Sequence, residues 1–171
     1  MHKFESFLCQ KNVRDLSALS LYYSFMHLKR FFEWIGLKER LDSRIMAAPH
    51  VSEGELWWAS LGENVGAEIN GKSRDFSRPV LIFRKLSSGF YFVIPLTTQM
   101  RTGSWYVSYQ QGDKECTACL HQARSIDYRR LHSRLGELDE VDFLRVQEAF
   151  QKLYMKISPA ISGRVAGNPR K

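Results

Sequence analysis

The chain has 171 residues, of which 44% are hydrophobic and 13% aromatic, enough for one domain with an appendage and a proper core. Its formal net charge of +7 at pH 7 favours an acidic partner, either a nucleic acid or an acidic protein segment. No apolar run approaches the ~20 residues of a membrane span. The N-terminus lacks the apolar core of a signal peptide, so we expect a cytoplasmic protein that has no membrane partner.

The first predicted element is a helix over residues 15–35, with Asp15 as N-cap and Gly36 as its end. Apolar residues spaced by three and four form one stripe along it. That stripe consists of Leu21, Phe25, Leu28, Phe32 and Ile35. A second apolar stripe lies roughly opposite, so the helix either docks on the main domain and contacts a second copy, or seats a regulatory partner. Residues 37–45 fit a short second helix, and residues 46–50 fit a linker.

The middle of the chain is predicted to contain about five short strands. They cover residues 53–61, 78–85, 90–99, 104–110 and 118–126. The second and third are apolar, β-rich runs joined by a Ser-Ser-Gly turn, which predicts a hairpin. The segment between the first two strands has no helical period and is long for a connection, so we expect it to be functional or mobile.

The last predicted element is a helix that begins after Asp139 and ends before Pro159. Its apolar stripe consists of Phe143, Val146, Phe150, Leu153 and Ile157. The order of elements predicts an α+β, mainly β fold: a small closed or half-closed barrel with a C-terminal helix and an added N-terminal helical segment. We expect residues 1–50 to be the helical extension and linker, residues 51–160 the barrel domain, and residues 161–171 a flexible tail.

Polar residues stand at one end of each hairpin strand. Arg78 starts the first strand, and Thr97, Thr98 and Gln99 end the second. Because the start of one antiparallel strand lies beside the end of the next, the hairpin brings a guanidinium close to two hydroxyls and an amide. Such a cluster suits an anionic phosphate, since arginine offers a planar fork of donors and threonine adds a neutral one.

Two further patterns leave alternatives open. Cys116 and Cys119 form a lone CxxC that lacks two of the ligands of a zinc site, so we interpret them as structural thiols rather than a metal or redox site. We expect His121 and His132 to be surface or structural residues, because neither is near the polar cluster in sequence. The tryptophans and Tyr106 either stack nucleobases or fill the core.

Five short motifs together resemble the PemK/MazF-like toxins of bacterial toxin–antitoxin systems. They are Gly-Glu-Leu-Trp-Trp at 54–58, Gly-x-Glu at 66–68, Arg-Pro-Val-Leu at 78–81, Pro-Leu-Thr-Thr-Gln at 95–99 and Gln-x-Arg-Ser-Ile-Asp at 122–127. Any one of them is weak, but five in this order at compatible spacings are fairly specific. The resemblance covers roughly residues 54–153.

The resemblance implies an SH3-like barrel of the CcdB/PemK type, a homodimer and a cognate antitoxin partner. It also implies an endoribonuclease that cuts single-stranded RNA without a metal or cofactor, through attack of a 2′-hydroxyl that leaves a 2′,3′-cyclic phosphate. The family's motifs assign catalysis to Arg78, Thr97 and Glu68. The expected RNA-binding residues are Lys72, Arg74, Thr98, Gln99, Arg101, Gln122 and Arg124.

Physical chemistry divides the work among the catalytic residues. Arg78 suits charge stabilisation better than proton removal, since its pKa lies above about 12. Glu68 is the best carboxylate for the base, and Thr97 would hold the phosphate. The alternative is a non-catalytic barrel of the same fold that binds DNA or a protein target such as gyrase.

Overall fold

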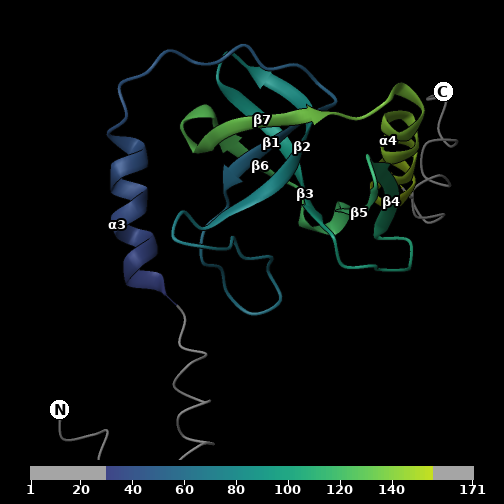
Figure 1. Cartoon of the computed structure of the whole chain (residues 1–171), viewed down its shortest axis with the longest axis horizontal. Helices are drawn as coiled ribbons and strands as arrows, with labels where there is room; N and C mark the ends of the chain where they lie inside the picture. The colour runs from purple at the N-terminus through teal and green to yellow at the C-terminus, as the bar shows by residue number, and fades with distance from the viewer. Residues whose placement is uncertain (1–29, 156–171) are drawn as a thin grey trace, which may run out of the picture. The chain divides into compact units, whose positions relative to one another are not determined.

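The computed structural model describes residues 30–155, which Figure 1 draws in colour. By its contacts the chain from Phe31 onwards forms one compact unit, to which every element described here belongs. That unit runs from helix α3 (Phe31–Asp42) through seven strands to helix α4 (Glu140–Tyr154). The predicted mainly β fold, with a helix before the strands and another after them, is confirmed.

The strands form one antiparallel sheet in the order β4-β5-β3-β2-β1-β7, with β6 paired to β3 off this path. The strands are β1 (Glu55–Ser60), β2 (Ser77–Ser87), β3 (Phe90–Thr97), β4 (Tyr106–Gln111), β5 (Lys114–Cys119), β6 (Arg124–Asp127) and β7 (Leu131–Glu137). Two short 3₁₀ turns, η1 (Leu120–Gln122) and η2 (Tyr128–Arg130), flank β6. Seven strands therefore replace the five expected.

The predicted hairpin is the centre of this sheet. Strands β2 and β3 pair with Val80 opposite Pro95 and Leu81 opposite Ile94, and the turn between them uses Gly89 at a φ of +91°. Only glycine adopts such a φ without strain, and a Cβ there would come within 2.8 Å of the Tyr128 ring. Two β-rich runs around a glycine turn were therefore sufficient to predict this hairpin from the sequence.

The predicted strand over residues 118–126 is wrong, because the chain bends twice within it. Strand β5 pairs with the end of β3 at Leu96 and Thr97, whereas β6 pairs with the beginning of β3 at residues 90–93. The η1 turn carries the chain from one site to the other. Both halves of the segment have β character, so local propensity alone does not reveal the break.

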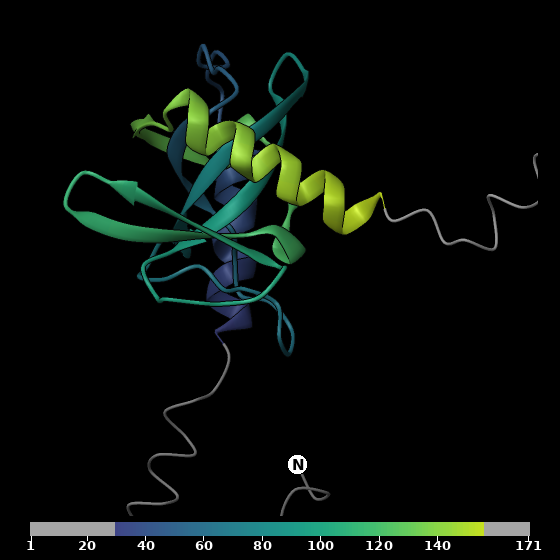
Figure 2. The ribbon, with the colours of Figure 1, turned by 90° about the vertical axis from the view of Figure 1, so that its right-hand side faces the viewer.

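Two apolar clusters cover the two faces of the central strands, as the period-2 alternation of side chains requires. Val80, Ile82 and Val93 belong to one cluster, and Leu81 and Ile94 belong to the other. Helix α4 packs on the second cluster, where Figure 2 shows it lying across the strands.

The C-terminal helix confirms its sequence signals. The Asp139 side chain accepts a hydrogen bond from the backbone N of Asp142 at 2.8 Å and so caps the helix. Val146 is fully buried, and Phe143, Phe150 and Leu153 pack beside it on the same cluster. Ile157 and Pro159 lie outside the described residues.

Helix α3 differs from its prediction. It runs through Gly36, which therefore does not end it, and it takes in much of the expected second helix. Its buried residues are Trp34, Leu37 and Leu41, which pack around Phe76. Phe32 and Ile35, the described members of the predicted stripe, are exposed. Asp15, Leu21, Phe25 and Leu28 lie outside the described residues. Burial on Phe76 outweighs the roughly 1 kcal/mol that a glycine costs inside a helix.

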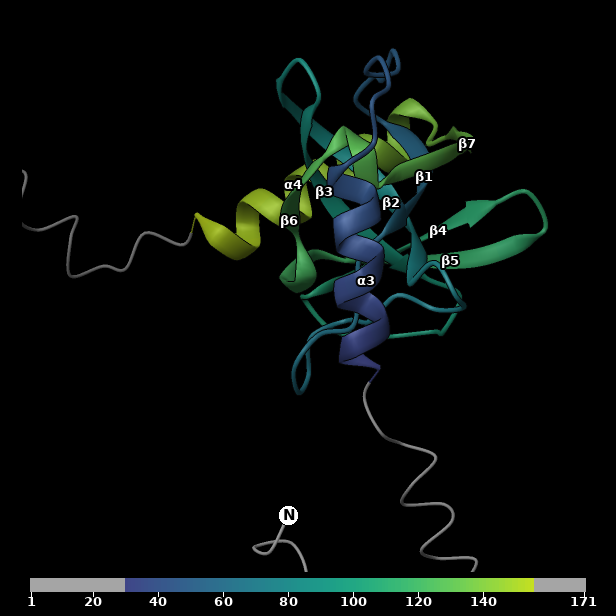
Figure 3. The same cartoon turned by 90° about the vertical axis from the view of Figure 1, so that its left-hand side faces the viewer.

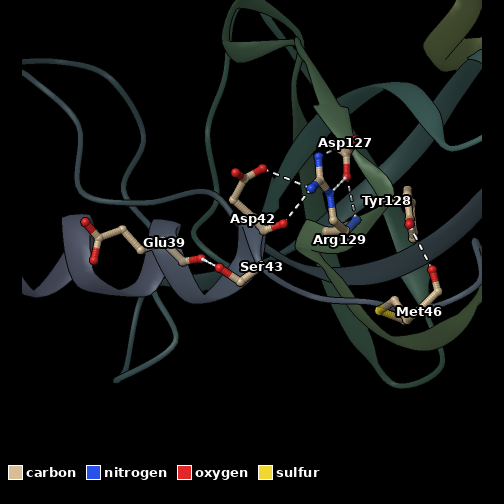
Figure 4. A network of polar contacts seen from close by, with 7 residues as sticks. All are labelled: Glu39, Asp42, Ser43, Met46, Asp127, Tyr128 and Arg129. Carbon is tan, nitrogen blue, oxygen red and sulfur yellow. Dashed lines mark hydrogen bonds and ion pairs between the residues drawn. The ribbon is translucent and has the colours of Figure 1, made fainter.

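A polar network fastens the end of α3 and the segment after it to the strands (Figure 4). The Arg129 guanidinium donates to the Asp127 carboxylate at 2.8 Å and to the backbone O of Asp42 at 2.7 Å. The Tyr128 hydroxyl donates to the backbone O of Met46 at 2.9 Å. Figure 3 shows α3 on the side of the sheet where β6 lies. Among residues 30–155 no helix is long and apolar enough to cross a membrane.

Candidate nucleic-acid site

Two neighbouring hollows lie at the end of β3. The larger has a volume of about 430 Å³ and the smaller about 310 Å³. Arg78, Thr97 and Lys72 line both of them. The guanidinium and the hydroxyl that the hairpin predicts to be neighbours therefore face the same spaces. The loops 61–76 and 98–105 hang from this end of the sheet in Figures 1 and 3.

Arg78 is held in place by two backbone carbonyls. Its Nε donates to the O of Asn70 at 2.8 Å, and its Nη1 donates to the O of Leu96 at 3.3 Å. A guanidinium has five N–H donors, so three remain for a ligand. Half-burial lowers the pKa of Arg78 through desolvation, yet an arginine stays protonated at neutral pH. The site thus contains a fixed cation with unused donors.

The Thr97 hydroxyl is also held by a backbone contact. Its Oγ1 accepts a hydrogen bond from the backbone N of Gln99 at 3.2 Å, which leaves the hydroxyl proton available to a ligand. Strand β3 ends at Thr97, so the alternation of faces stops there. As a result Thr98 also lines the larger hollow, whereas Thr97 lines both.

The loop between β1 and β2 is ordered by its own hydrogen bonds. The Asn64 backbone N donates to the Asn70 side chain at 2.7 Å, and the Gly71 N donates to the O of Gly62 at 2.8 Å. Gly71 is required here, because a Cβ would lie 1.6 Å from the carbonyl O of Phe76. This loop supplies the Asn70 carbonyl that holds Arg78, so its conformation and that of the site are linked.

Glu68 is not brought together with the other two predicted catalytic residues. It is exposed, and its carboxylate accepts a hydrogen bond from the backbone N of Val65 at 3.1 Å. Its neighbours Ala67 and Ile69 line the smaller hollow, but Glu68 lines neither hollow. The carboxylate is turned back onto its own loop.

Two predicted RNA-binding residues hold that loop. The Gln122 side chain accepts from the Ile69 N at 3.0 Å and donates to the Ala67 O at 3.3 Å, and it also lines the smaller hollow. Arg124 donates to the O of Leu61 at 3.3 Å and lines neither hollow. Both side chains are half-buried. Their hydrogen bonds are therefore made with the protein, to backbone atoms and, for Arg124, also to the Asn64 side chain.

The other predicted RNA-binding residues divide into two groups. Gln99 and Arg101 line the smaller hollow, where the Arg101 Nη2 donates to the Gln99 Oε1 at 3.0 Å. Lys72 is exposed and lines both hollows. Arg74 is exposed on the loop but lines neither.

Sequence reasoning missed His121. We expected a surface or structural residue because His121 is not near the polar cluster in sequence, yet in the structure it lines the smaller hollow with Arg78 and Thr97. The β3–β5 pairing and the η1 turn bring it there, and both were hidden by the mistaken single strand. His132 lines neither hollow, and its Nε2 lies 2.7 Å from the hydroxyl of Ser60 on the neighbouring strand.

The aromatic residues of the predicted site divide into buried and more exposed side chains. Trp57 is buried, and its Nε1 donates to the Glu55 carboxylate at 2.9 Å. Trp58 lies on the rim of the larger hollow and is 36% exposed. Tyr106 lines the smaller hollow, and Trp105, just before β4, is 53% exposed.

The two cysteines do not form one site. Both thiols are free, with Cys116 lining the larger hollow and Cys119 the smaller. Burial raises the pKa of Cys119, although the nearby Arg78 and Arg101 oppose that rise. Within residues 30–155 no cluster of three or more His, Cys, Asp or Glu side chains is arranged to hold a metal ion.

The guanidinium of Arg78, the hydroxyl of Thr97 and the exposed ammonium of Lys72 thus surround the same spaces, and such groups can bind an anionic phosphate. Over residues 52–154 the chain matches the family of PemK-like, MazF-like toxins of type II toxin–antitoxin systems, and it belongs to that family.

Solved structures share the fold at low identity. An endoribonuclease in complex with its cognate antitoxin, from Mycobacterial species, is 16% identical with a TM-score of 0.51, and the match covers 64% of this chain and 100% of that one. MazF from Deinococcus radiodurans is 20% identical with a TM-score of 0.51, covering 61% and 97%. A comparison with curated protein sequences gave no match.

Proposed function

We propose that this chain is a toxin that cleaves single-stranded RNA without a metal ion, by attack of a 2′-hydroxyl on the adjacent phosphate. The observation that carries the proposal is that Arg78 and Thr97 line the same two hollows, together with Lys72. Membership of the toxin family supports it, as does the description of a protein of similar fold as an endoribonuclease.

The proposed reaction forms a bond between O2′ and phosphorus and breaks the bond between phosphorus and O5′. It leaves a 2′,3′-cyclic phosphate and a 5′-hydroxyl: the 2′-hydroxyl loses its proton to the base, and the departing O5′ takes up a proton from water. Arg78 stabilises the charge on the non-bridging oxygens through its three unused donors. The Thr97 hydroxyl donates to the same phosphate and fixes its orientation.

Glu68 is the proposed base, and its use requires a change at the loop. In the present conformation its carboxylate is bonded to the Val65 N. The exposed side chain has to leave that partner and rotate towards the smaller hollow, which its neighbours Ala67 and Ile69 already line. RNA binding would supply a 2′-hydroxyl that competes with the Val65 N as the donor to this carboxylate.

The proposed path of the RNA backbone follows the basic and polar residues around the hollows. Lys72, Arg74, Thr98, Gln99 and Arg101 are exposed there or beside it. We assign Gln122 and Arg124 to the RNA site through the loop that they hold. In the cytoplasm a homodimer would be neutralised by a cognate antitoxin, and the net charge of +7 suits an acidic antitoxin segment that competes with RNA.

The test is cleavage of a long single-stranded RNA in the presence of EDTA. We expect cutting by the wild type and a loss of about 10²- to 10³-fold in Arg78→Ala, the size of a lost oxyanion donor. Arg78→Lys is the matched control, since it keeps the charge but loses the planar fork. The products should end in a cyclic phosphate.

Two results would contradict the proposal. One is intact RNA after incubation with folded, antitoxin-free wild type, and the other is a set of products with 3′-hydroxyl ends. Tight binding of DNA or gyrase without any RNA cleavage would favour the non-catalytic binding protein instead.

A further inference from the structure

Three aromatic rings meet beside the smaller hollow. The His121 ring lies 5.3 Å from the Trp105 ring at an interplanar angle of 37°, and 5.2 Å from the Tyr106 ring at 81°. His121 and Tyr106 line the smaller hollow, which Arg78 and Thr97 also line. This aromatic group, His121 with Trp105 and Tyr106, is therefore next to the place proposed for the scissile phosphate.

The His121 ring has one nitrogen with no use inside the protein. Its Nδ1 is buried and has no hydrogen-bond partner among the described residues. A buried N–H without an acceptor is costly, so the tautomer that leaves Nδ1 without a proton is favoured. The proton then resides on Nε2, the nitrogen that is left to the hollow. In that tautomer His121 offers its Nε2–H as a hydrogen-bond donor.

Trp105 supplies an exposed flat surface beside His121. Its side chain is 53% exposed, although its backbone is fixed, with its O accepting from the Leu120 N at 2.9 Å. A rigidly anchored, exposed indole beside a polar hollow is what unpaired nucleobases stack on in single-stranded RNA recognition. The larger hollow has a different wall, which includes Trp58, Tyr109 and Leu135.

We propose that Trp105, Tyr106 and His121 form a nucleobase subsite for the nucleotide on one side of the scissile phosphate. The base stacks on Trp105, and the His121 Nε2–H donates to an acceptor on the base edge, which makes His121 a specificity-determining residue. The inference rests on the proposed function, because it needs single-stranded RNA in the same site. It assigns this nucleotide to the smaller hollow rather than to the larger one.

Tryptophan fluorescence tests the stacking directly. The probes are four 2′-O-methyl hexanucleotides, each of a single base, which lack the attacking hydroxyl and so stay intact. We expect at least one to quench the wild type, the quench to be lost in Trp105→Phe and kept in Trp58→Phe, and Trp105→Ala to bind roughly 5- to 100-fold more weakly. A quench that persists in Trp105→Phe and disappears in Trp58→Phe would move the base to the larger hollow and overturn the subsite.

A pair of His121 variants tests the hydrogen bond. His121→Phe keeps a ring against Trp105 and Tyr106 but has no donor, whereas His121→Gln keeps a donor near the position of Nε2. We expect the ranking of the four oligonucleotides by affinity to flatten in the first variant and to be partly restored in the second. An unchanged ranking in His121→Phe overturns the assignment.

Cleavage of long RNA by the wild type separates this inference from the proposed function. If the wild type cuts RNA but its fluorescence is unaffected by all four oligonucleotides, the subsite is wrong and the nuclease stands. If it neither cuts RNA nor binds any oligonucleotide, both fail.

Discussion

Replacing Gln122 with alanine distinguishes a side chain that holds the loop from one that touches RNA. The change removes the hydrogen bonds to the Ile69 N at 3.0 Å and to the Ala67 O at 3.3 Å. Each is worth about 1 kcal/mol net, and a half-buried N–H left without a partner costs up to about 3 kcal/mol. We therefore expect the free energy of opening the loop to fall by about 1.5–3 kcal/mol, which is roughly a 10- to 100-fold increase in the open population.

Native-state hydrogen exchange of the RNA-free protein measures this change. The reporting amides are those of Asn64 and Gly71, whose hydrogen bonds lie within the loop. Gln99→Ala is the matched control, because the hydrogen bond that its side chain makes is with Arg101 and not with the loop. We also expect slower RNA cleavage in Gln122→Ala, since the loop holds Arg78 through Asn70.

One result would contradict the loop-holding role of Gln122. If the loop amides of Gln122→Ala exchange at wild-type rates while RNA affinity drops, Gln122 acts by direct contact with RNA. The assignment made from sequence would then be right, and the loop-holding role wrong.

Three substitutions test the fold around the site. Gly71→Ala should destabilise the protein by about 3 kcal/mol or more, because its Cβ would collide with the Phe76 carbonyl. Gly36→Ala lies inside α3 with space for a methyl group and should stabilise by about 1 kcal/mol, and urea unfolding measures both. The opposite sign for either would contradict the packing described. The hydrogen bond from Arg129 lowers the pKa of Asp127 from its ordinary 3.8, so its stabilisation is present above that pH and is lost as the pH falls below it. The stability advantage of wild type over Asp127→Asn should thus shrink below about pH 3.8, and a constant difference across that range would rule this out.

The central hairpin and the last helix were predictable because their signals are local. A glycine turn between two β-rich runs identifies β2 and β3, and an aspartate cap before an apolar stripe identifies α4. The meeting of Arg78 and Thr97 followed from antiparallel pairing alone. No knowledge of distant contacts was needed for any of these.

The wrong predictions concern segments whose structure depends on contacts with residues that are distant in the sequence. Gly36 lies inside a helix because Trp34 and its neighbours bury themselves on Phe76, a residue from another part of the chain. The break between β5 and β6 exists because β3 offers its edge to each in turn. His121 enters the site through that break, so the missed turn and the missed residue have one cause.

Trp34 packs against Phe76 but lies before the region that matches the family. A Cβ on Gly62 would come within 2.5 Å of the Trp34 ring, so the indole covers the very point at which the β1–β2 loop departs. The family match begins only at residue 52, after this tryptophan. A protein trimmed to the shared region would lack Trp34. Phe76 would then be exposed to water, and the β1–β2 loop that holds Arg78 would lose the indole that covers its start. For this chain the region shared with the family and the compact unit that begins at Phe31 are therefore two different lengths of polypeptide.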